Sequence, residues 1–560
     1  MIWRYRVILV ILILAFLAVL SRLFYWQVVK AENLSQLGQL QYERSIGNLA
    51  ERGEIKTSDN FPVATNKISY LVFANPKQIK NKTDTSLVLS SQLSVDKASI
   101  SAALSKDKYW VSLKSGLKIE EKEKLEGLKI PGVGFEETYT RFYPEASMAA
   151  HLLGFVGKDD LGKDKGYFGL EGYYDRLLRG KEGTAVEVYD ALGLPVLQEA
   201  SNSPEKVKGN SLVLNINRAI QFITDEKLKK GIEKYGATGG VVAVMEPATG
   251  NILALSSFPS FSPSEYGEFD ASLYKNPSIS NLYEPGSTLK PLIMSAALDA
   301  SLVTPQTKCN ICDKPVSIGG YEIRTWNNEY FKDINMVDVI RHSDNTGMVF
   351  VGQKMGIDRM INSLNKFGIG EGTGIDLQGE TSQSLPPKNK WYAVDLATRA
   401  FGQGISVTPI ELLVAFSSIA SGGLRMEPHV VGAIQTADGK TIKISPKVLG
   451  RTISENTSKV MTEMLVNAVN KGEASFARLK GYRIAGKTGT ASIPIAGHYD
   501  PNKTVASFIG YAPADNPKFV MLVVFDKPTS SIYGAETAAP VFFDIARQIL
   551  LYYGISPSEE

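Results

Sequence analysis

The hydrophobic positions of the chain begin with one continuous run at the N-terminus. Residues 7–20 read VILVILILAFLAVL and contain no charged or polar side chain. About 20 residues are needed to cross the hydrocarbon core of a bilayer. Residues 7–29 reach that length if Arg22 extends toward the membrane surface. The pattern therefore predicts a cytoplasmic stub and one transmembrane helix within residues 1–30.

The residues that flank this run predict its orientation and its retention. Arg4 and Arg6 precede the span, and aromatic residues bracket it. Because positive charge collects on the cytoplasmic side of membranes, we expect a cytoplasmic N-terminus and an extracytoplasmic remainder. A cleaved signal peptide is the alternative, but Phe24, Tyr25 and Trp26 stand where a small-x-small cleavage site would be needed.

Between residues 31 and 215 the apolar segments are short, and polar residues separate them. The lysine-rich tract 104–129 mixes charges of both signs, which is typical of a solvated, partly helical surface. The tripeptide Ser-Asp-Asn at residues 58–60 lies between short strand-like segments, which predicts a hairpin with its turn there. We expect one domain over residues 31–215.

The apolar pattern changes after this region. A strand-like segment and an amphipathic helix are expected within residues 208–236. Two later segments, 238–261 and 504–526, each contain two apolar runs joined by turn residues and predict antiparallel strand pairs. A helix is expected over 539–554. Strand pairs with helices between them predict an α+β domain around an antiparallel sheet, which we place at residues 216–556.

Length and charge narrow the class of protein. A chain of 560 residues is long enough for two or more domains. With 61 basic and 58 acidic residues the net charge is +3, and this balance gives no reason to expect a nucleic-acid partner.

The cysteines and histidines predict neither a metal site nor another cofactor. Cys309 and Cys312 are the only cysteines, and one C-x-x-C pair supplies only half of a structural zinc site. A small local disulfide and two inert thiols both remain open. The four histidines form no H-E-x-x-H motif or comparable cluster.

The segment YEPGSTLKPLIMSAALDA contains the first candidate catalytic residues, Ser287 and Lys290. Other Ser-x-x-Lys matches occur in the chain, but here a glycine precedes the serine and an apolar helix-like run follows. Residues at i and i+3 share one face of a helix, so the Lys290 amine can reach the Ser287 hydroxyl. A desolvated lysine can act as the base that activates a serine nucleophile.

A second Ser-Asp-Asn occurs at residues 343–345, inside the helix-like stretch 335–356. Ser343 could relay protons, and Asn345 could bind a substrate amide, whereas Asp344 need not face the site. A third element, YRIAGKTGTAS, is expected to form a strand. There Lys487 and Thr488 would hold a substrate carboxylate.

Two neighbours of Lys487 and Thr488 complete the set of candidate residues. Gly489 would let a substrate backbone pair closely with the strand edge, and Thr490 follows it.

Ser-x-x-Lys, Ser-x-Asn and Lys-Thr-Gly, in this order, are the signature of penicillin-binding proteins and serine β-lactamases. The chain resembles a class B penicillin-binding protein over nearly its whole length. The motif RGEI at residues 52–55 and the segments RFYPEASMAAHLLGFVG and GLEGYYDRLLRGKEG are similar to motifs of that family's pedestal. One departure is the turn after RGEI, where residues 57–60 read Thr-Ser-Asp-Asn instead of the family's usual Asp-Arg-Asn-Gly.

The resemblance implies a fold. It places a penicillin-binding and serine β-lactamase-like transpeptidase domain, with an antiparallel sheet flanked by helices and a helical subdomain, over residues 216–556. An elongated, non-catalytic pedestal, or dimerisation, domain would occupy residues 31–215.

The resemblance also implies a mechanism. Ser287 would attack the penultimate D-Ala of a peptidoglycan stem peptide, with Lys290 as general base and Ser343, Asn345 and Lys487 as further catalytic residues. The backbone N–H groups of Ser287 and Thr490 would form the oxyanion hole. An amine from a neighbouring strand would complete the cross-link, and β-lactams would acylate the serine.

Other functions share these motifs. A β-lactamase or β-lactam sensor would not need a long pedestal behind a membrane anchor, and a D,D-carboxypeptidase would use water as acceptor. A mainly non-enzymatic scaffold of the wall-synthesis complex is a further alternative, against which the intact motifs argue. Within class B the context of the second motif favours the division type over the elongation type. We therefore expect a septal role with a SEDS-family glycosyltransferase and divisome proteins as partners.

Overall fold

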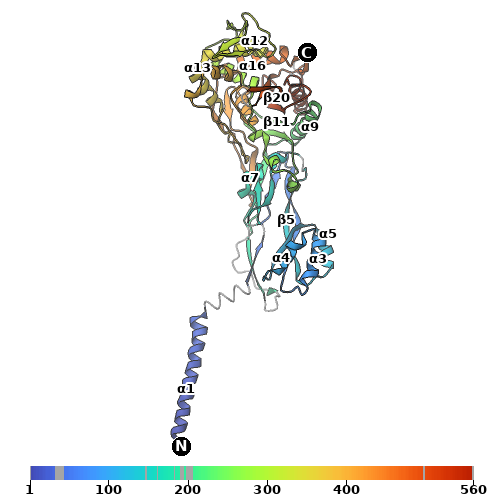
Figure 1. Cartoon of the computed structure of the whole chain (residues 1–560), viewed down its shortest axis with the longest axis vertical. Coiled ribbons are helices and arrows are strands. Elements are labelled where there is room, and N and C mark those ends of the chain that lie inside the picture. The colour runs from blue at the N-terminus through green and yellow to red at the C-terminus, as the bar shows by residue number, and fades with distance from the viewer. Residues whose placement is uncertain are drawn as a thin grey trace. The chain divides into compact units, whose positions relative to one another are not determined.

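The computed structural model describes most of the chain, and Figure 1 follows it by colour from the N-terminus to the C-terminus. The described residues are 2–31, 43–48, 50–145, 148–160, 162–181, 183–189, 195–196, 206–495 and 498–557. They form two compact units. The first unit comprises residues 1–51 and 180–209, and the second comprises residues 52–179 and 210–560.

The first unit contains the predicted membrane span. Helix α1 (Ile2–Phe24) continues into a π-helical turn over Tyr25–Val29, and none of its residues is buried. By length and composition this 28-residue segment can cross a membrane, as the sequence predicts. The unit also holds a small antiparallel sheet in the order β1-β8-β9. Its strands are β1 (Glu43–Asn48), β8 (Gly183–Tyr189) and β9 (Pro195–Val196).

Segments far apart in the sequence of the second unit share a seven-stranded sheet, in the order β17-β16-β10-β2-β3-β4 with β5 paired to β3. The strands are β2 (Ile55–Lys56), β3 (Pro62–Ala74), β4 (Val111–Leu117), β5 (Val133–Phe142), β10 (Ser211–Leu214), β16 (Val431–Gln435) and β17 (Thr441–Lys443). Strand β10 runs parallel to β2 and antiparallel to β16. The boundary predicted at residue 215 directly follows β10.

Helices α3 (Lys82–Leu93), α4 (Lys97–Ser105) and α5 (Ile119–Gly127) form a small core with strands β3, β4 and β5. The lysine-rich tract contains α5, as the mixed charges predict, but it also contains β4. The sequence does not reveal this strand, because only Val111 and Leu117 at its ends are fully buried while lysine and serine separate them.

The first Ser-Asp-Asn tripeptide forms the turn between β2 and β3, so the predicted hairpin is confirmed. The Thr57 amide donates to the Phe61 carbonyl over 2.9 Å, and the Asn60 amide donates to the Thr57 carbonyl over 2.9 Å. Asn60 has φ 63°, a left-handed conformation that asparagine tolerates.

A buried ion cluster ties the RGEI motif to the following helices. Arg52 donates to Glu171 over 2.7 Å and to Asp175 over 2.9 Å, and Arg141 donates to the other Glu171 oxygen over 2.6 Å. Glu171 is fully buried, so its charge depends on these two arginines. The surrounding elements are α6 (Ala150–Leu153), β6 (Phe155–Lys158), β7 (Asp164–Tyr167), α7 (Gly169–Tyr173) and α8 (Asp175–Leu178).

A five-stranded antiparallel sheet in the order β12-β11-β21-β20-β19 forms the centre of the second unit's C-terminal part. The strands are β11 (Gly239–Met245), β12 (Ile252–Phe258), β19 (Ala485–Ile495), β20 (His498–Ala512) and β21 (Phe519–Asp526). Both strand pairs predicted from the sequence lie in this sheet, and β19 forms one edge.

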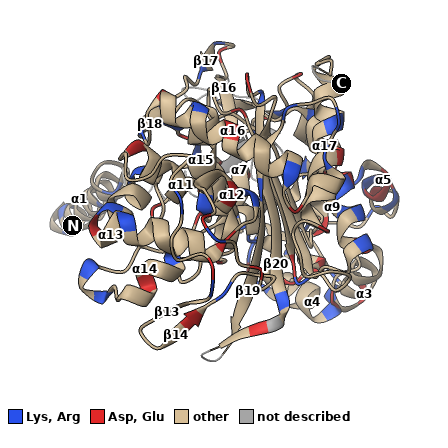
Figure 2. Cartoon of the chain, turned by 90° about the horizontal axis from the view of Figure 1, so that it is seen from above, with Lys and Arg blue, Asp and Glu red and all other residues tan. Residues whose placement is uncertain are grey.

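Helices cover both faces of this sheet. Figure 2 shows α9 (Arg218–Tyr235) and α17 (Ala538–Tyr552) on one side of the strands and α11 (Lys290–Asp299), α15 (Pro409–Ala420) and α16 (Glu455–Lys471) on the other. Strand β21 is therefore apolar at consecutive positions: Leu522 and Val524 enter one core, and Met521 and Val523 enter the other. The predicted α+β architecture is confirmed.

A helical region adjoins the face covered by α11. Its further helices are α10 (Pro277–Ser280), α12 (Met336–Arg341), α13 (Asn345–Phe367) and α14 (Ala393–Arg399). Two short hairpins also occur here: β13 (Val316–Ile318) with β14 (Tyr321–Ile323), and β15 (Leu424–Met426) with β18 (Val448–Arg451). Helix α11 packs against α13, so the side chains of the two elements meet next to the sheet edge at β19.

Candidate active site

Ser287 lies in a 3₁₀ turn, Gly286–Thr288, directly before α11. Gly286 has φ 56°, and a Cβ atom there would lie 3.2 Å from the Thr490 carbonyl oxygen. A glycine therefore suits both the left-handed backbone and the close approach of the turn to β19. Pro291 stands in the first turn of α11, where a missing amide proton costs nothing.

Lys290 is fully buried, and its ammonium group is held by the second motif. Its Nζ donates to the Ser343 carbonyl oxygen over 2.6 Å, to Asn345 Oδ1 over 2.8 Å and to Ser343 Oγ over 3.2 Å. Burial, and next the charge of Lys487, lower the pKa of Lys290 to about 7. Because a general base must be neutral, this pKa prepares Lys290 to accept a proton near neutrality.

The second Ser-Asp-Asn lies between two helices, which corrects the expectation of one helix-like stretch. Helix α12 ends at Arg341, and α13 begins at Asn345. Between them Ser343 has φ 54°, a strained left-handed conformation for a residue with a side chain. Asp344 caps α13, because its Oδ1 accepts from the Gly347 amide over 2.9 Å. Asp344 therefore stabilises the start of α13, which agrees with the expectation that it need not face the site.

Ser343 connects Lys290 to the candidate nucleophile. Its hydroxyl donates to Ser287 Oγ over 2.9 Å, while Lys290 Nζ donates to Ser343 Oγ. The hydrogen bonds of the described residues therefore run from Lys290 through Ser343 to Ser287. Among the described residues Lys290 Nζ bonds Ser343 and Asn345 and not Ser287, so the direct contact that the i and i+3 spacing predicts stays a prediction.

The third motif lies on the edge strand β19, as predicted. Lys487 is 3% exposed, and its Nζ donates to Thr488 Oγ1 over 2.9 Å. Thr488 Oγ1 in turn donates to Glu473 Oε2 over 2.7 Å. Burial lowers the pKa of Lys487, and the charge of Glu473 opposes that shift.

Gly489 is fixed by the packing of the protein itself. A Cβ atom at this position would lie 2.4 Å from Ser507 Oγ and 2.7 Å from Thr288 Cγ2. The absence of a side chain therefore lets β19 approach both β20 and the turn that carries Ser287. Close pairing with a substrate backbone, for which the sequence singled out this glycine, remains a prediction.

The three motifs face one cavity of about 500 Å³. Its lining includes Ser287, Ser343, Asn345, Thr488 and Thr490. The structure thus brings the candidate residues of all three motifs together, although they are far apart in the sequence.

Sequence reasoning missed other residues of this cavity. Aromatic residues that line it include Trp326, Phe476 and Tyr533, and the Trp326 and Tyr533 rings meet edge to face with centroids 5.6 Å apart. Glu473 is another missed residue. None of them belongs to a spaced motif, so only their position next to Ser-x-Asn or Lys-Thr-Gly could have drawn notice.

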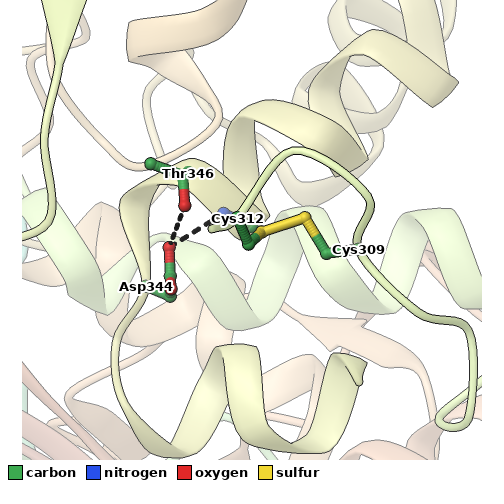
Figure 3. Close-up of a disulfide and its surroundings, with 5 residues drawn as sticks. Cys309, Cys312, Asp344 and Thr346 are labelled. Carbon is green, nitrogen blue, oxygen red and sulfur yellow. Dashed lines mark hydrogen bonds between the residues drawn. A yellow bond between two sulfur atoms is a disulfide. The ribbon is translucent and has the colours of Figure 1, made fainter. Parts of the chain in front are cut away.

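Cys309 and Cys312 form a disulfide, which decides between the two states left open by the sequence. Figure 3 shows the disulfide beside Asp344 and Thr346, at the start of α13. Both cysteines are buried. Among the described residues no group of three or more His, Cys, Asp or Glu side chains could hold a metal ion.

Family profiles match both parts of the chain. The penicillin-binding protein transpeptidase domain matches residues 240–548, and the penicillin-binding protein dimerisation domain matches residues 48–214.

Curated relatives are similar over almost the whole chain. Stage V sporulation protein D of Bacillus subtilis is 34% identical, covering 99% of this chain and 86% of that protein. The peptidoglycan D,D-transpeptidase FtsI of Escherichia coli is 28% identical, covering 99% of this chain and 92% of that protein.

Solved structures show the same fold. A peptidoglycan synthetase from Bifidobacterium adolescentis has a TM-score of 0.75 and 25% identity, covering 92% of this chain and 98% of its own. Penicillin-binding protein 2X from Streptococcus thermophilus has a TM-score of 0.74 and 23% identity, covering 92% of this chain and 83% of its own.

Proposed function

This chain belongs to the penicillin-binding protein transpeptidase family and is a serine-type peptidoglycan D,D-transpeptidase, and we propose that Ser287 is the residue that it acylates. The observation that carries this assignment is the hydrogen-bonded series from Lys290 through Ser343 to Ser287 in the cavity. Among the described residues, the serines of the other Ser-x-x-Lys matches do not line this cavity.

In the acylation step Ser287 Oγ attacks the carbonyl carbon of the penultimate D-Ala. The hydroxyl proton passes to neutral Lys290, directly or through Ser343, which already bonds both residues. The bond from that carbon to the terminal D-Ala nitrogen then breaks, and the same proton returns to the leaving amine. Protonated Lys290 and Ser343 are placed to deliver it.

The negative charge that develops on the carbonyl oxygen needs fixed donors. We assign this role to the backbone N–H groups of Ser287 and Thr490, whose segments are packed together where Gly286 meets β19. One such donor contributes about 3 kcal/mol to the transition state in other serine enzymes.

Substrate binding falls to the second and third motifs. Lys487 and Thr488 would hold the terminal carboxylate of the stem peptide, and Thr490 would continue that subsite along β19. Asn345 Nδ2 donates one proton to the Arg324 carbonyl over 2.9 Å, and its second N–H would bind a carbonyl of the peptide. Gly489 keeps the strand edge close to Ser287.

In the second half-reaction an amine from a neighbouring stem peptide attacks the acyl-enzyme. The new amide bond forms as the ester bond to Ser287 breaks, and Lys290 accepts the amine proton and returns one to Ser287. β-Lactams acylate Ser287 in the same way as the peptide, because their carboxylate and strained amide occupy the positions of the substrate groups.

We place the catalytic domain at residues 216–556 and the pedestal at residues 31–215. The family matches at 240–548 and 48–214 support these bounds. An apolar N-terminal helix supports a single-pass membrane anchor. Arg4 and Arg6 ahead of it favour a cytoplasmic N-terminus and an extracytoplasmic catalytic domain.

For the cellular role we favour septal wall synthesis. Likeness to FtsI over 99% of this chain supports a division-type role. The two matched domains supply peptide cross-linking, so a membrane-embedded SEDS-family glycosyltransferase would supply glycan polymerisation, with other divisome proteins in the same complex. A fluorescent fusion of the full chain should form a ring at midcell. Lateral patches would favour an elongation role, and signal confined to sporulating cells would favour the context named by the Bacillus subtilis relative.

The acylation assignment is tested by labelling the full chain in detergent with fluorescent penicillin. Ser287→Ala should lose the covalent label while the melting temperature stays near that of the wild type. Ser115→Ala is the matched control, since Ser115 and Lys118 form another Ser-x-x-Lys, at β4 in the pedestal. Persistent labelling of Ser287→Ala would overturn the assignment.

A further inference from the structure

Glu473 enters the active-site cavity from the loop that follows α16. The helix ends at Lys471, and Gly472 turns the chain at once. A Cβ atom on Gly472 would lie 2.4 Å from the Ala468 carbonyl oxygen and 2.8 Å from the Arg341 carbonyl oxygen. The tight turn delivers the Glu473 carboxylate to the third motif.

The carboxylate is linked to Lys487 through one threonine, Thr488. Its Oε2 accepts the Thr488 hydroxyl proton over 2.7 Å, and Thr488 Oγ1 accepts from Lys487 Nζ over 2.9 Å. A threonine hydroxyl has one proton to donate. Because Glu473 takes that proton, the Thr488 oxygen turns its lone pairs toward the Lys487 ammonium.

The other carboxylate oxygen of Glu473 makes no hydrogen bond that would explain a buried glutamate at this position. Glu473 Oε1 is buried and has no hydrogen-bond partner among the described residues. A buried acceptor without a partner costs about 1–3 kcal/mol of stability. An apolar side chain would avoid that cost, so the presence of a carboxylate here calls for a function.

Two buried lysines share this site, and burial favours the neutral form of both. The charge of Glu473 raises the pKa of Lys487, against the larger effect of burial. The charge of Lys487 in turn lowers the pKa of Lys290, while Glu473 and Asp344 raise it. The Glu473 carboxylate is linked by hydrogen bonds to Lys487 and not to Lys290. It therefore favours protonated Lys487 over protonated Lys290.

We propose that Glu473 is a positioning residue that keeps Lys487 as the cation of the active site, so that Lys290 is the lysine free to act as base. This inference rests on the proposed function, because it uses Lys487 as the carboxylate-binding group and Lys290 as the general base. It assigns a role in lysine protonation to a residue outside the three motifs.

The test is the pH profile of the second-order rate of acylation by a fluorescent penicillin, measured on the full chain in detergent. Acylation requires neutral Lys290 on the acidic limb and charged Lys487 on the basic limb. Removing the negative charge in Glu473→Gln lowers the pKa of both lysines, so both limbs should move to lower pH. A shift of about one pH unit is expected for loss of a nearby opposite charge.

Glu473→Asp is the conservative variant, and it should restore the limbs toward their wild-type positions because it keeps the charge. Glu536→Gln is the matched control for charge loss. Glu536 also lines the cavity, but its described hydrogen bond comes from Ser531 and not from Thr488 or a lysine. Its limbs should stay within a few tenths of a pH unit of the wild type, on the same scale of charge effects.

A Glu473→Gln profile that superposes on the wild type would overturn the inference, as would an equal shift in Glu536→Gln. Neither result would affect the proposed function, which fails only if Ser287→Ala retains the label. Melting temperatures of all variants are compared first. If Glu473→Gln does not fold, Glu473→Ala, which also removes the charge, takes its place, and the same shift of both limbs to lower pH is expected.

Discussion

Ser343 Oγ lies 2.9 Å from Ser287 Oγ and donates the hydrogen bond between them. The nucleophile is therefore an acceptor in the resting site, and its own proton is free to turn toward a base. Lys290 already bonds Ser343 through both the carbonyl and the hydroxyl oxygen. The left-handed backbone of Ser343 allows one residue to offer both groups to the same amine.

This geometry predicts two different effects at Ser343. Ser343→Ala and Ser343→Gly both remove the relay hydroxyl, so each should slow acylation by about 10²–10⁴-fold, the usual contribution of a positioned proton donor or acceptor. Glycine adopts φ 54° without strain, so Ser343→Gly should be more stable than Ser343→Ala by about 1 kcal/mol.

Stopped-flow acylation and thermal unfolding measure the two effects at Ser343 separately. Ser343→Thr, which keeps a hydroxyl, is the control for the relay. Wild-type acylation rates in both Ser343→Ala and Ser343→Gly would rule out the relay.

A second prediction follows from the pKa of about 7 at Lys290. Only the neutral amine can accept the Ser287 proton, and its fraction grows as pH rises through that value. The second-order acylation rate of the wild type should therefore rise about tenfold per pH unit below neutrality and level off above it. Penicillin hydrolysis without enzyme is subtracted at each pH. A rate that is flat between about pH 5.5 and pH 8 would show that Lys290 is not the titrating base.

The ordered motifs predicted residues that share one site, but not the hydrogen bonds within it. Lys290 starts a helix and Lys487 lies on a strand, as the pattern predicts, whereas Ser287 lies in a 3₁₀ turn before the helix on which the i and i+3 spacing placed it. Such motifs are readable because chemistry fixes residue types at short spacings. Glu473 reaches the site only through the tertiary approach of a loop to β19, which leaves no periodic signal in the chain.

The break between α12 and α13 was hidden for a related reason. Apolar residues continue on both sides of Ser343, so the pattern reads as one helix. Asp344 caps α13 through its hydrogen bond from the Gly347 amide. An aspartate can also occur inside a helix and bond nearby backbone groups there, so its presence alone does not predict a helix start. The contacts that Lys290 makes with the left-handed Ser343 accompany the break, and they come from another helix.

The ion cluster around Glu171 predicts a large stability effect in the pedestal. Arg52→Met should lower the free energy of unfolding by about 3–5 kcal/mol, because it leaves buried carboxylates of Glu171 and Asp175 short of a partner. Thermal unfolding and hydrogen exchange over residues 164–179 would report the loss. Lys459→Ala removes an exposed helical pair with Glu455 and should leave the melting temperature close to that of the wild type. Equal effects of the two variants would contradict the role assigned to the cluster.

Replacing Gly489 should lower both the stability of the protein and its acylation rate. In Gly489→Ala the new methyl group would meet Ser507 Oγ at 2.4 Å and Thr288 Cγ2 at 2.7 Å, so either β19 or the Ser287 turn must move. A displacement of about 1 Å at a reacting group can cost 10²-fold in rate. We therefore expect acylation to fall by about that factor, with overpacking also lowering stability by about 1–3 kcal/mol.

Gly450→Ala is the matched control for Gly489→Ala, because nothing lies within 4 Å of a Cβ atom at that strand position. It should leave both the acylation rate and the melting temperature near the wild-type values. If Gly489→Ala behaved like Gly450→Ala, the turn that carries Ser287 would tolerate a methyl group, and the close contacts at Gly489 would not be the reason for the glycine. The glycine of the third motif would then have to be explained by substrate contact alone.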